Sequence, residues 1–352
     1  MLNSTKRGFI IGAGSLGIPL FEKLSQGGRQ FRLLTRPSSG DRSTLIKDLK
    51  NSTKDNLHAH PKYDVIFAET VEDYQKVFAE EKPYFMVITI PQPDPALLNY
   101  LLSVENCFKV YISSPAADFA RACPDKVKPG SYPYDKCRDE DLVNIRGVKF
   151  GDALAVQIGF IPEMNEIFGS PIPSGLSQKT MLGCLLTTGF YDSLIDRIDE
   201  IDNKTGKPVI RTVLDNFKLS KGFTCTSIDS LYRLLGFLYT EESKQTFKGL
   251  GGNTIAYHSS QVWEREKILN AMQNANYRND GYEFYGAKSP QKISQPVMHT
   301  RKFFGDRMNV THDDIMQAII ETKRTFEANQ ETYIQMYLEM IRGDFDEIIN
   351  KQ

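Results

Sequence analysis

The sequence predicts an α/β fold, in which a doubly wound parallel sheet is followed by a mainly helical second domain. Five short apolar segments alternate with helical patterns over about the first 115 residues, an arrangement typical of parallel strands joined by helices. Long helical patterns dominate beyond about residue 143. The chain of 352 residues is also longer than a single hydrophobic core usually supports, so two domains are expected.

The first strand, helix and strand follow closely on one another. Residues 8–11 are a short apolar run, and residues 15–24 place apolar side chains at helical spacing. Residues 31–35 are a second apolar run, which ends before Pro37 and a loop rich in serine and glycine. We expect strands over 8–11 and 31–35 and helices over 15–24 and 43–49.

The next elements repeat this alternation. Three further apolar runs predict strands, and the segments between them have helical spacing. In order, these elements are strand 63–69, helix 71–81, strand 84–90, helix 95–104 and strand 108–114. Residues 1–120 are therefore assigned to the sheet domain.

The regular alternation stops at Pro115. Residues 121–142 are rich in Pro, Asp and Lys without a sustained period, so we interpret them as a crossing segment between domains. Residues 143–352 then form the second domain, in which an extended segment at 148–164 precedes helical patterns. These patterns cover 227–247, 261–275 and 313–350. Aromatic and Met residues that recur at helical intervals in the last of them indicate packing, in the core or in a homodimer interface.

The composition limits the classes of function. A formal net charge of −1 gives no field that would attract a nucleic-acid backbone or an anionic membrane, so neither partner is expected. Gly12 and Gly14 interrupt the N-terminal apolar run too early for a signal peptide, and no apolar stretch is long enough to span a bilayer. We expect a cytoplasmic protein. The five cysteines are far apart and odd in number, which argues against a disulfide framework and a structural zinc site.

The segment "GAGSLG" follows the first predicted strand and opens the first predicted helix. It places Gly12, Gly14 and Gly17 at the spacing of a dinucleotide-binding turn, with Ser15 and Leu16 between the last two. The first glycine permits the tight turn, the second lets the backbone approach a pyrophosphate, and the third lets the helix pack against the strand. We therefore expect residues 1–120 to bind a dinucleotide; the alternative is a glycine-rich turn that binds nothing.

The end of the second strand bears on the identity of the dinucleotide. An NAD site usually has a carboxylate there for the ribose hydroxyls, but this chain has Thr35 and Arg36, followed by Ser38 and Ser39. The planar fork of an arginine suits a phosphate, and serine hydroxyls add donors. These residues favour NADP(H) over NAD(H). Two alternatives stay open: Arg36 is a solvated loop residue, or Asp41 reaches the ribose.

The loops after the fourth and fifth strands are further candidates for the cofactor site. Ligands of open α/β sheets lie outside the carboxyl ends of the strands. Pro91 and Gln92 follow the fourth strand, and Ser113 and Ser114 end the fifth. We expect Pro91 and Gln92 to line the nicotinamide half of the site and either serine to reach the same region.

The motifs "GAGSLG", "TR" after the second strand and "IPQP" after the fourth resemble those of the NAD(P)-binding Rossmann dehydrogenases and reductases. The order of a nucleotide domain and a largely helical domain also resembles the 6-phosphogluconate, ketopantoate-reductase and opine types. The resemblance covers about a third of the chain. It implies a cofactor site and a redox function, and it assigns no catalytic residue.

Hydride transfer also needs a group that supplies or accepts a proton. His258 follows a glycine-rich loop that we expect to precede a helix, so it is a candidate acid/base at the domain cleft. Glu163, in "GFIPEMNE", is a candidate buried general base. The alternatives are structural: His258 at a helix terminus, and Glu163 in a first helical turn where it complements the dipole.

The leading hypothesis is an NADP(H)-dependent oxidoreductase that acts on a small polar carbonyl, imine or hydroxy substrate. A non-catalytic NADP(H) sensor is the main rival, because the sequence leaves the acid/base unassigned. A transferase or lyase that uses the same fold for another adenine ligand is the third option.

Overall fold

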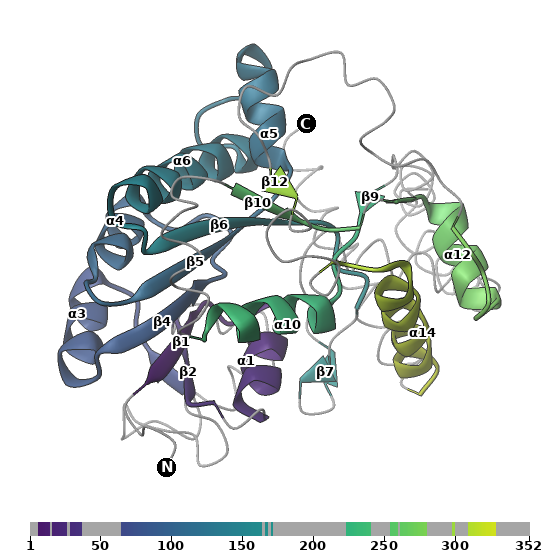
Figure 1. The fold of residues 1–352 in the computed structure, drawn as a ribbon, viewed down its shortest axis with the longest axis horizontal. Coiled ribbons are helices and arrows are strands. Elements are labelled where there is room, and N and C mark those ends of the chain that lie inside the picture. The colour runs from purple at the N-terminus through teal and green to yellow at the C-terminus, as the bar shows by residue number, and fades with distance from the viewer. Residues whose placement is uncertain are drawn as a thin grey trace, which may run out of the picture. The chain divides into compact units, whose positions relative to one another are not determined.

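The computed structural model describes residues 6–14, 16–26, 29–36, 65–163, 166–167, 170–171, 223–240, 254–259, 261–279, 298–299 and 309–328 (Figure 1). The chain forms two compact units. The first comprises residues 1–159, 228–258 and 288–309, and the second comprises residues 160–227, 259–287 and 310–352. Each unit is thus built from several segments, whereas the sequence predicts one crossing region at 121–142.

The first unit contains a parallel eight-stranded sheet in the order β12-β10-β6-β5-β4-β1-β2-β3. Its strands are β1 (Arg7–Ile11), β2 (Phe31–Thr35), β3 (Val65–Phe67), β4 (Pro83–Ile88), β5 (Phe108–Ser113), β6 (Ala153–Ile158), β10 (Thr254–Tyr257) and β12 (Met298–His299). The five predicted strands are all present, and the predicted doubly wound parallel sheet is confirmed. The chain order reverses between β1 and β4, which is the point where such sheets bind ligands.

Helices lie on both faces of this sheet, as Figure 1 shows. On one face, α1 (Gly17–Gln26) packs beside α10 (Ile228–Leu238). On the other face lie α3 (Val71–Glu80), α4 (Pro95–Ser103) and α6 (Tyr132–Phe150). Their apolar side chains and those of the strands form one buried core, which includes Phe9, Ile88, Leu98 and Val143. Strands covered on both faces are continuously apolar, and for this reason the sequence pattern identifies them.

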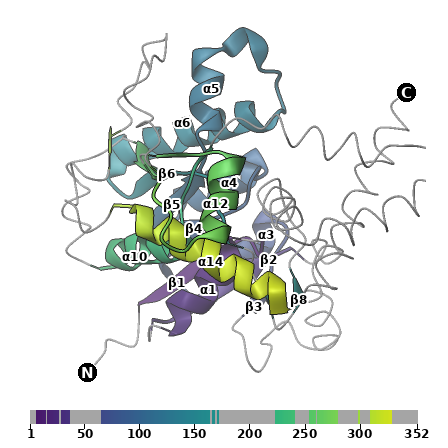
Figure 2. The same ribbon diagram turned by 90° about the vertical axis from the view of Figure 1, so that its right-hand side faces the viewer.

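The segment predicted as a crossing region is part of the first unit. Residues 121–142 contain the end of α5 (Ala116–Ala122), a short 3-10 turn and the first half of α6. Figure 2 shows α5 beside α6 in a second view. The prediction is wrong here because Pro133 stands in the first turn of α6, where its missing N–H breaks no helical hydrogen bond.

The described part of the second unit contains α12 (Arg265–Gln273) and α14 (His312–Ala328), which pack together, and two small antiparallel strand pairs. One pairs β9 (Phe223–Thr224) with β11 (Val262–Trp263), and the other pairs β7 (Glu166–Ile167) with β8 (Ser170–Pro171). The helix predicted over 261–275 thus begins only after a short strand. The helix predicted over 43–49 lies outside the described residues, as does Cys184, one of the five cysteines. The end of the C-terminal helical pattern also lies outside them, so the mainly helical second domain stays a prediction.

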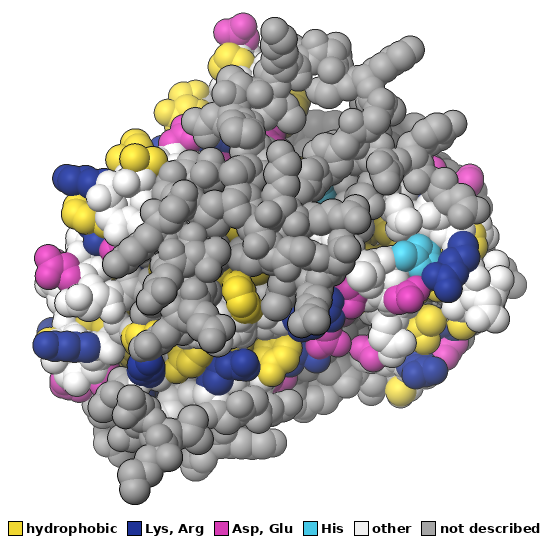
Figure 3. Space-filling model, viewed as in Figure 1, with side chains coloured by type: hydrophobic (Ala, Val, Ile, Leu, Met, Phe, Trp, Pro, Cys, Tyr) yellow, Lys and Arg dark blue, Asp and Glu magenta, His cyan; other side chains and the backbone are white. Residues whose placement is uncertain are grey.

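Charged side chains of both signs are interspersed on the surface in Figure 3, in line with a net charge of −1. No helix in the described part of the chain is both long enough and apolar enough to cross a membrane. Within the same part of the chain, no cluster of three or more His, Cys, Asp or Glu side chains is arranged to hold a metal ion.

Candidate functional site

The glycine turn follows β1 and is shaped by close packing. Gly12 has a φ of +113°, a region that favours glycine, and a Cβ there would lie 2.9 Å from the Thr89 hydroxyl. A Cβ on Gly17 would lie only 1.8 Å from the Gly12 carbonyl oxygen. The Thr89 hydroxyl lies 3.0 Å from the carbonyl oxygens of both Ile11 and Gly12, to which it donates. The turn is therefore fixed against β1 and the end of β4.

Gly14 differs from the other two glycines of the turn. A Cβ at this position meets no described atom within 4 Å, and the residue is exposed. Leu16 is half-buried immediately before α1, and Ser15 lies outside the described residues. The backbone at Gly14 is thus open to an approaching group at the N-terminus of α1, where free N–H groups favour an anion.

The second predicted contact region lies at the end of β2, the neighbour of β1. Thr35 is the last residue of β2 and is buried, and Arg36, the next residue, is exposed. Arg36 lies close enough to Tyr74 of α3 to act on the pKa of its phenol, which burial raises and the Arg36 charge lowers. Ser38 and Ser39 lie outside the described residues.

Pro91 and Gln92 follow β4 at the same edge of the sheet, and both are exposed. The Gln92 amide donates to a carboxylate oxygen of Asp135 at 2.7 Å. Asp135 belongs to α6, so this hydrogen bond ties the predicted cofactor loop to that helix. Two candidate site residues that the sequence does not single out, Tyr132 and Lys136, lie on the same helix.

Two chemically distinctive side chains begin α6. Tyr132 and Lys136 are four residues apart, so they lie on the same side of the helix. The Lys136 ammonium lies 5.8 Å from the centre of the Tyr132 ring and 4.5 Å from the centre of the Tyr111 ring in β5. It donates to the Tyr111 hydroxyl at 3.0 Å and to the Ile112 carbonyl at 2.8 Å. Burial lowers the pKa of Lys136 to about 8, although Asp139 and Glu140 act in the opposite direction.

Ser114 joins this pair from the end of β5. Burial raises the pKa of the Tyr132 phenol, and a hydrogen bond with the Ser114 side chain counteracts the rise. The Tyr132 residue keeps 42% of its surface exposed. The Ser114 hydroxyl also accepts from the Ala116 N–H at 3.2 Å, which fixes its place before α5. A serine hydroxyl, a tyrosine phenol and a lysine ammonium are therefore neighbours here.

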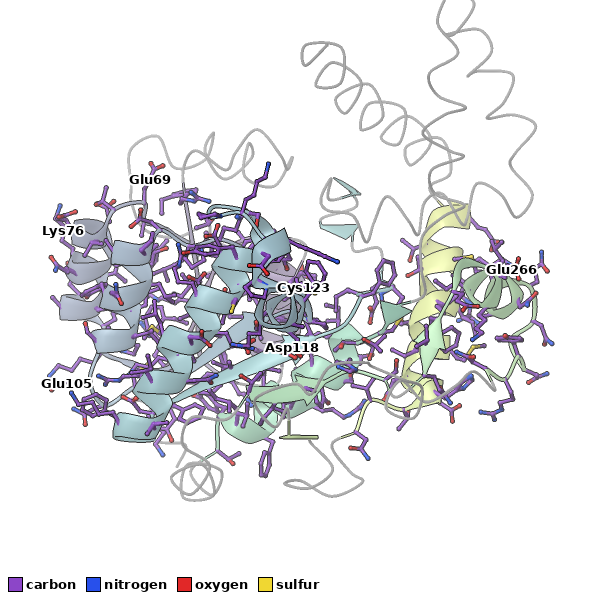
Figure 4. The ribbon with its side chains drawn as sticks, turned by 90° about the horizontal axis from the view of Figure 1, so that it is seen from above. Glu69, Lys76, Glu105, Asp118, Cys123 and Glu266 are labelled. Atoms are coloured by element: carbon purple, nitrogen blue, oxygen red, sulfur yellow. The ribbon has the colours of Figure 1, made fainter. Side chains whose placement is uncertain are left out.

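Ser113, the other candidate serine, has a structural partner. Its hydroxyl donates to the fully buried Glu140 carboxylate at 2.5 Å, and Arg121 donates to the same carboxylate at 2.6 Å. Arg121 also pairs with Asp118 of α5, which Figure 4 labels together with Cys123. This network links α5 and α6 to the end of β5. Because its members satisfy one another, we interpret it as support for the neighbouring site.

The two predicted catalytic residues belong to different units. His258 is part of the first unit and directly follows β10. The short strand β11 separates it from α12, so the expectation that it lies near a helix start is wrong. The run Thr254–Tyr257 is a buried parallel strand paired with β6, and four residues carry too little periodicity to identify it. Glu163 is part of the second unit and follows an extended segment. Catalytic roles for His258 and Glu163 stay predictions.

One signal in the sequence marks the missed pair. A Tyr and a Lys four residues apart, after a strand that ends in two serines, place a phenol and an ammonium on one helix face. The signal is visible only if residues 132–150 are recognised as a helix, and the surrounding prolines conceal it.

No protein-family model matches the chain, and no curated protein matches it by sequence. Solved structures do resemble it. The Bordetella bronchiseptica enzyme WbmF in complex with NADH aligns over 95% of this chain and 96% of its own, at 14% identity and a TM-score of 0.54. The same enzyme with NAD⁺ and UDP gives a TM-score of 0.53 at equal identity and coverage. Thermus thermophilus UDP-glucose 4-epimerase in complex with NAD aligns over 90% and 99% of the two chains, at 12% identity and a TM-score of 0.51.

At these identities the likeness concerns the fold. It supports the predicted Rossmann architecture across most of the chain. These similar structures are not of the 6-phosphogluconate, ketopantoate-reductase or opine types, so that finer part of the resemblance is not supported.

Proposed function

We propose that the chain is an NADP(H)-dependent oxidoreductase with Tyr132 as its proton donor and acceptor. The observation that carries the proposal is the group formed by Ser114, Tyr132 and Lys136. It lies at the carboxyl end of β5, and the glycine turn follows β1 in the same parallel sheet. Hydride chemistry needs both a dinucleotide and a proton-transferring group, and this edge carries a glycine turn suited to the first and side chains suited to the second.

The residues of the turn fit a dinucleotide. A Cβ at Gly12 or Gly17 would clash with the backbone or with the Thr89 hydroxyl. A Cβ at Gly14 would meet no described atom within 4 Å, so a side chain there would occupy space next to the turn. A glycine at that position is not required by the packing of the described chain, and a ligand that needs close backbone approach accounts for it. Gly12, Gly14 and Leu16 would hold the pyrophosphate, and the loop at Pro91 and Gln92 would adjoin the nicotinamide half.

The bound dinucleotide would supply or accept the hydride. Tyr132 would donate a proton from its phenol to the substrate oxygen or nitrogen in reduction and take it back in oxidation. Ser114 would orient that atom by a hydrogen bond. The Lys136 ammonium, 5.8 Å from the centre of the Tyr132 ring, would favour the phenolate through space. Opposite charges about 6 Å apart interact by roughly 1 kcal/mol in water and by roughly 3 kcal/mol near a protein surface.

The choice of NADP(H) rests on Arg36. In the sequence it directly follows Thr35 at the end of β2, where an NAD site usually has a carboxylate, and Arg36 is an exposed residue. The similar structures were solved with NAD⁺ or NADH, so NAD(H) is the competing cofactor.

The substrate class is a small polar carbonyl, imine or hydroxy compound. Nucleotide sugars come first in a screen, because the similar structures include a UDP complex and a UDP-glucose 4-epimerase. The chain is incubated with NADP⁺ or NAD⁺ and a panel of UDP-sugars and hydroxy acids, and nicotinamide absorbance and sugar interconversion are followed.

Two matched variants make this screen decisive. Tyr132→Phe removes the proposed acid/base, and Tyr134→Phe removes an equally exposed phenol from the same helix. Turnover that is lost in the first variant and kept in the second supports the proposal. Dinucleotide binding without turnover on the whole panel favours the sensor, and equal turnover in both variants refutes Tyr132 as the acid/base.

A further inference from the structure

A chain of hydrogen bonds runs from Lys136 to a buried carboxylate that the proposed reaction does not use. The Lys136 ammonium donates to the Tyr111 hydroxyl at 3.0 Å, and Tyr111 donates to a carboxylate oxygen of Asp139 at 3.2 Å. The Arg138 guanidinium donates to the other oxygen of Asp139 at 2.6 and 2.8 Å. All donors point toward the carboxylate, which suits its ionised, acceptor-only form.

The three central side chains are buried. Tyr111 and Asp139 have no exposed surface, and Lys136 has 3%. Charged groups inside a protein are costly unless they are paired, so this arrangement is energetically demanding. An apolar residue at Tyr111 or Asp139 would fill the same space at lower cost. Packing alone therefore does not account for the choice of residues.

We propose that Tyr111 and Asp139 are positioning residues that hold the Lys136 ammonium in place and in its charged form beside Tyr132. This inference rests on the proposed function of the site. Within the described chain, two of the three Lys136 N–H groups are used, by Tyr111 and by the Ile112 carbonyl. The ammonium is thereby fixed against β5, with its charge directed at the phenol by the geometry of the helix.

The charges around Lys136 set the sign of the expected effect. From β5 it faces the Tyr111 ring and hydroxyl, and from α6 it faces Tyr132, Asp139 and Glu140. Burial lowers the pKa of Lys136, while Asp139 and Glu140 raise it. Loss of the Asp139 charge should lower the pKa of Lys136 further. Lys136 would then lose its proton at a lower pH in the variant than in the natural chain.

Two substitutions test the chain of hydrogen bonds, and a third serves as control. Asp139→Asn keeps the size and an acceptor but removes the charge, and Tyr111→Phe keeps the ring under the ammonium but removes the hydroxyl. Tyr74→Phe removes a buried hydroxyl that has no hydrogen-bond partner in the described part of the chain. Far-UV circular dichroism checks that each variant is folded.

The first readout needs no dinucleotide. Lysine labelled with ¹³C and ¹⁵N reports the titration of Lys136 by NMR, with the signal assigned from a Lys136→Arg variant. We expect Asp139→Asn to lower the titration midpoint by about one pH unit, since it removes one nearby charge. Tyr111→Phe should also lower the titration midpoint of Lys136. The double variant should lower it little more than Asp139→Asn alone, because both substitutions act through the same series of hydrogen bonds. Tyr74→Phe should leave it unchanged.

The second readout is the pH dependence of turnover, with the dissociation constant of NADPH measured alongside. A midpoint lowered from about 8 to about 7 leaves about half of Lys136 charged at pH 7 but only about a tenth at pH 8. Asp139→Asn should therefore reduce turnover by up to about twofold at pH 7 and about fivefold at pH 8, which shifts the pH profile. Tyr134→Phe, the control of the turnover screen, should match the natural chain in this readout. If Tyr111 and Asp139 had only a structural role, their substitution would lower the melting temperature without shifting the pH dependence of turnover.

The two readouts separate the possible failures. An unchanged Lys136 midpoint in folded Asp139→Asn and Tyr111→Phe overturns the inference. A shifted midpoint with an unmoved turnover profile also overturns it, since the lysine charge would then not serve the reaction. If the natural chain binds no dinucleotide, the proposed function fails, and the midpoint alone then decides whether Tyr111 and Asp139 hold the lysine charge.

Discussion

Gly17 and Gly14 stand three residues apart in the same turn, yet they should respond oppositely to alanine. At Gly17 the new Cβ would lie 1.8 Å from the Gly12 carbonyl oxygen, so α1 must move by at least about 1.6 Å to restore an ordinary contact in a close-packed interior. The obstacle is backbone and cannot rotate away. We expect Gly17→Ala to lose at least about 3 kcal/mol of unfolding free energy, at the upper end for overpacking. For a domain of this size, that is a fall of roughly 6–12 °C in melting temperature.

Gly14→Ala should leave stability within about 0.5 kcal/mol of the natural chain, because its Cβ meets no described atom. It should weaken NADPH binding about thirtyfold, because the new methyl group would keep a phosphate oxygen from a backbone N–H. The loss of one such charge-assisted hydrogen bond corresponds to about 2 kcal/mol. Thermal denaturation followed by circular dichroism and an NADPH titration measure both effects. If Gly17→Ala is as stable as the natural chain, or if folded Gly14→Ala binds NADPH undiminished, this account of the turn is refuted.

Three further predictions concern single side chains. Tyr132→Phe should lower turnover about 10²- to 10⁴-fold, the usual contribution of a general acid/base, with a melting temperature near that of the natural chain; comparable turnover contradicts the role of the phenol. Arg36→Asp should weaken NADPH binding selectively, and an equal loss for NADH would show that Arg36 does not bind the 2′-phosphate. Burial raises the pKa of Asp152, but Arg146 and the buried Lys109 outweigh it and hold that pKa below its usual value. Stability from this group is thus present above about pH 4 and lost as pH falls through the lowered pKa. Asp152→Asn should cost about 3 kcal/mol at pH 7, and the difference from the natural chain in denaturant unfolding should shrink at acidic pH; a pH-independent difference would contradict this.

The sequence predicts best what depends on local pattern. The five strands β1 to β5 are mainly apolar because helices cover both faces of the sheet, so each is recognisable alone. The glycine turn is equally local, since the crowding at Gly12 and Gly17 follows directly from the strand-turn-helix geometry. In these cases the physical cause lies within about ten residues of the pattern that reveals it.

The remainder depends on pairing between distant segments. Strand β10 lies beside β6, about a hundred residues earlier, and the four residues from Thr254 to Tyr257 carry no signal of that pairing. The local pattern therefore puts His258 before a helix instead of after a strand. Lys136 in turn becomes distinctive only when β5 brings Tyr111 against it, because an isolated lysine in a polar segment is usually solvated.

The most direct test of the central claim, that this sheet edge binds a nicotinamide dinucleotide, is a titration of the purified chain with NADPH and with NADH. Binding is followed by the nicotinamide fluorescence, with Gly14→Ala as the folded control. We predict saturable binding of NADPH that is tighter than that of NADH and is weakened about thirtyfold in the control. If neither dinucleotide binds, the turn has a structural role only, and the proposed oxidoreductase function is contradicted.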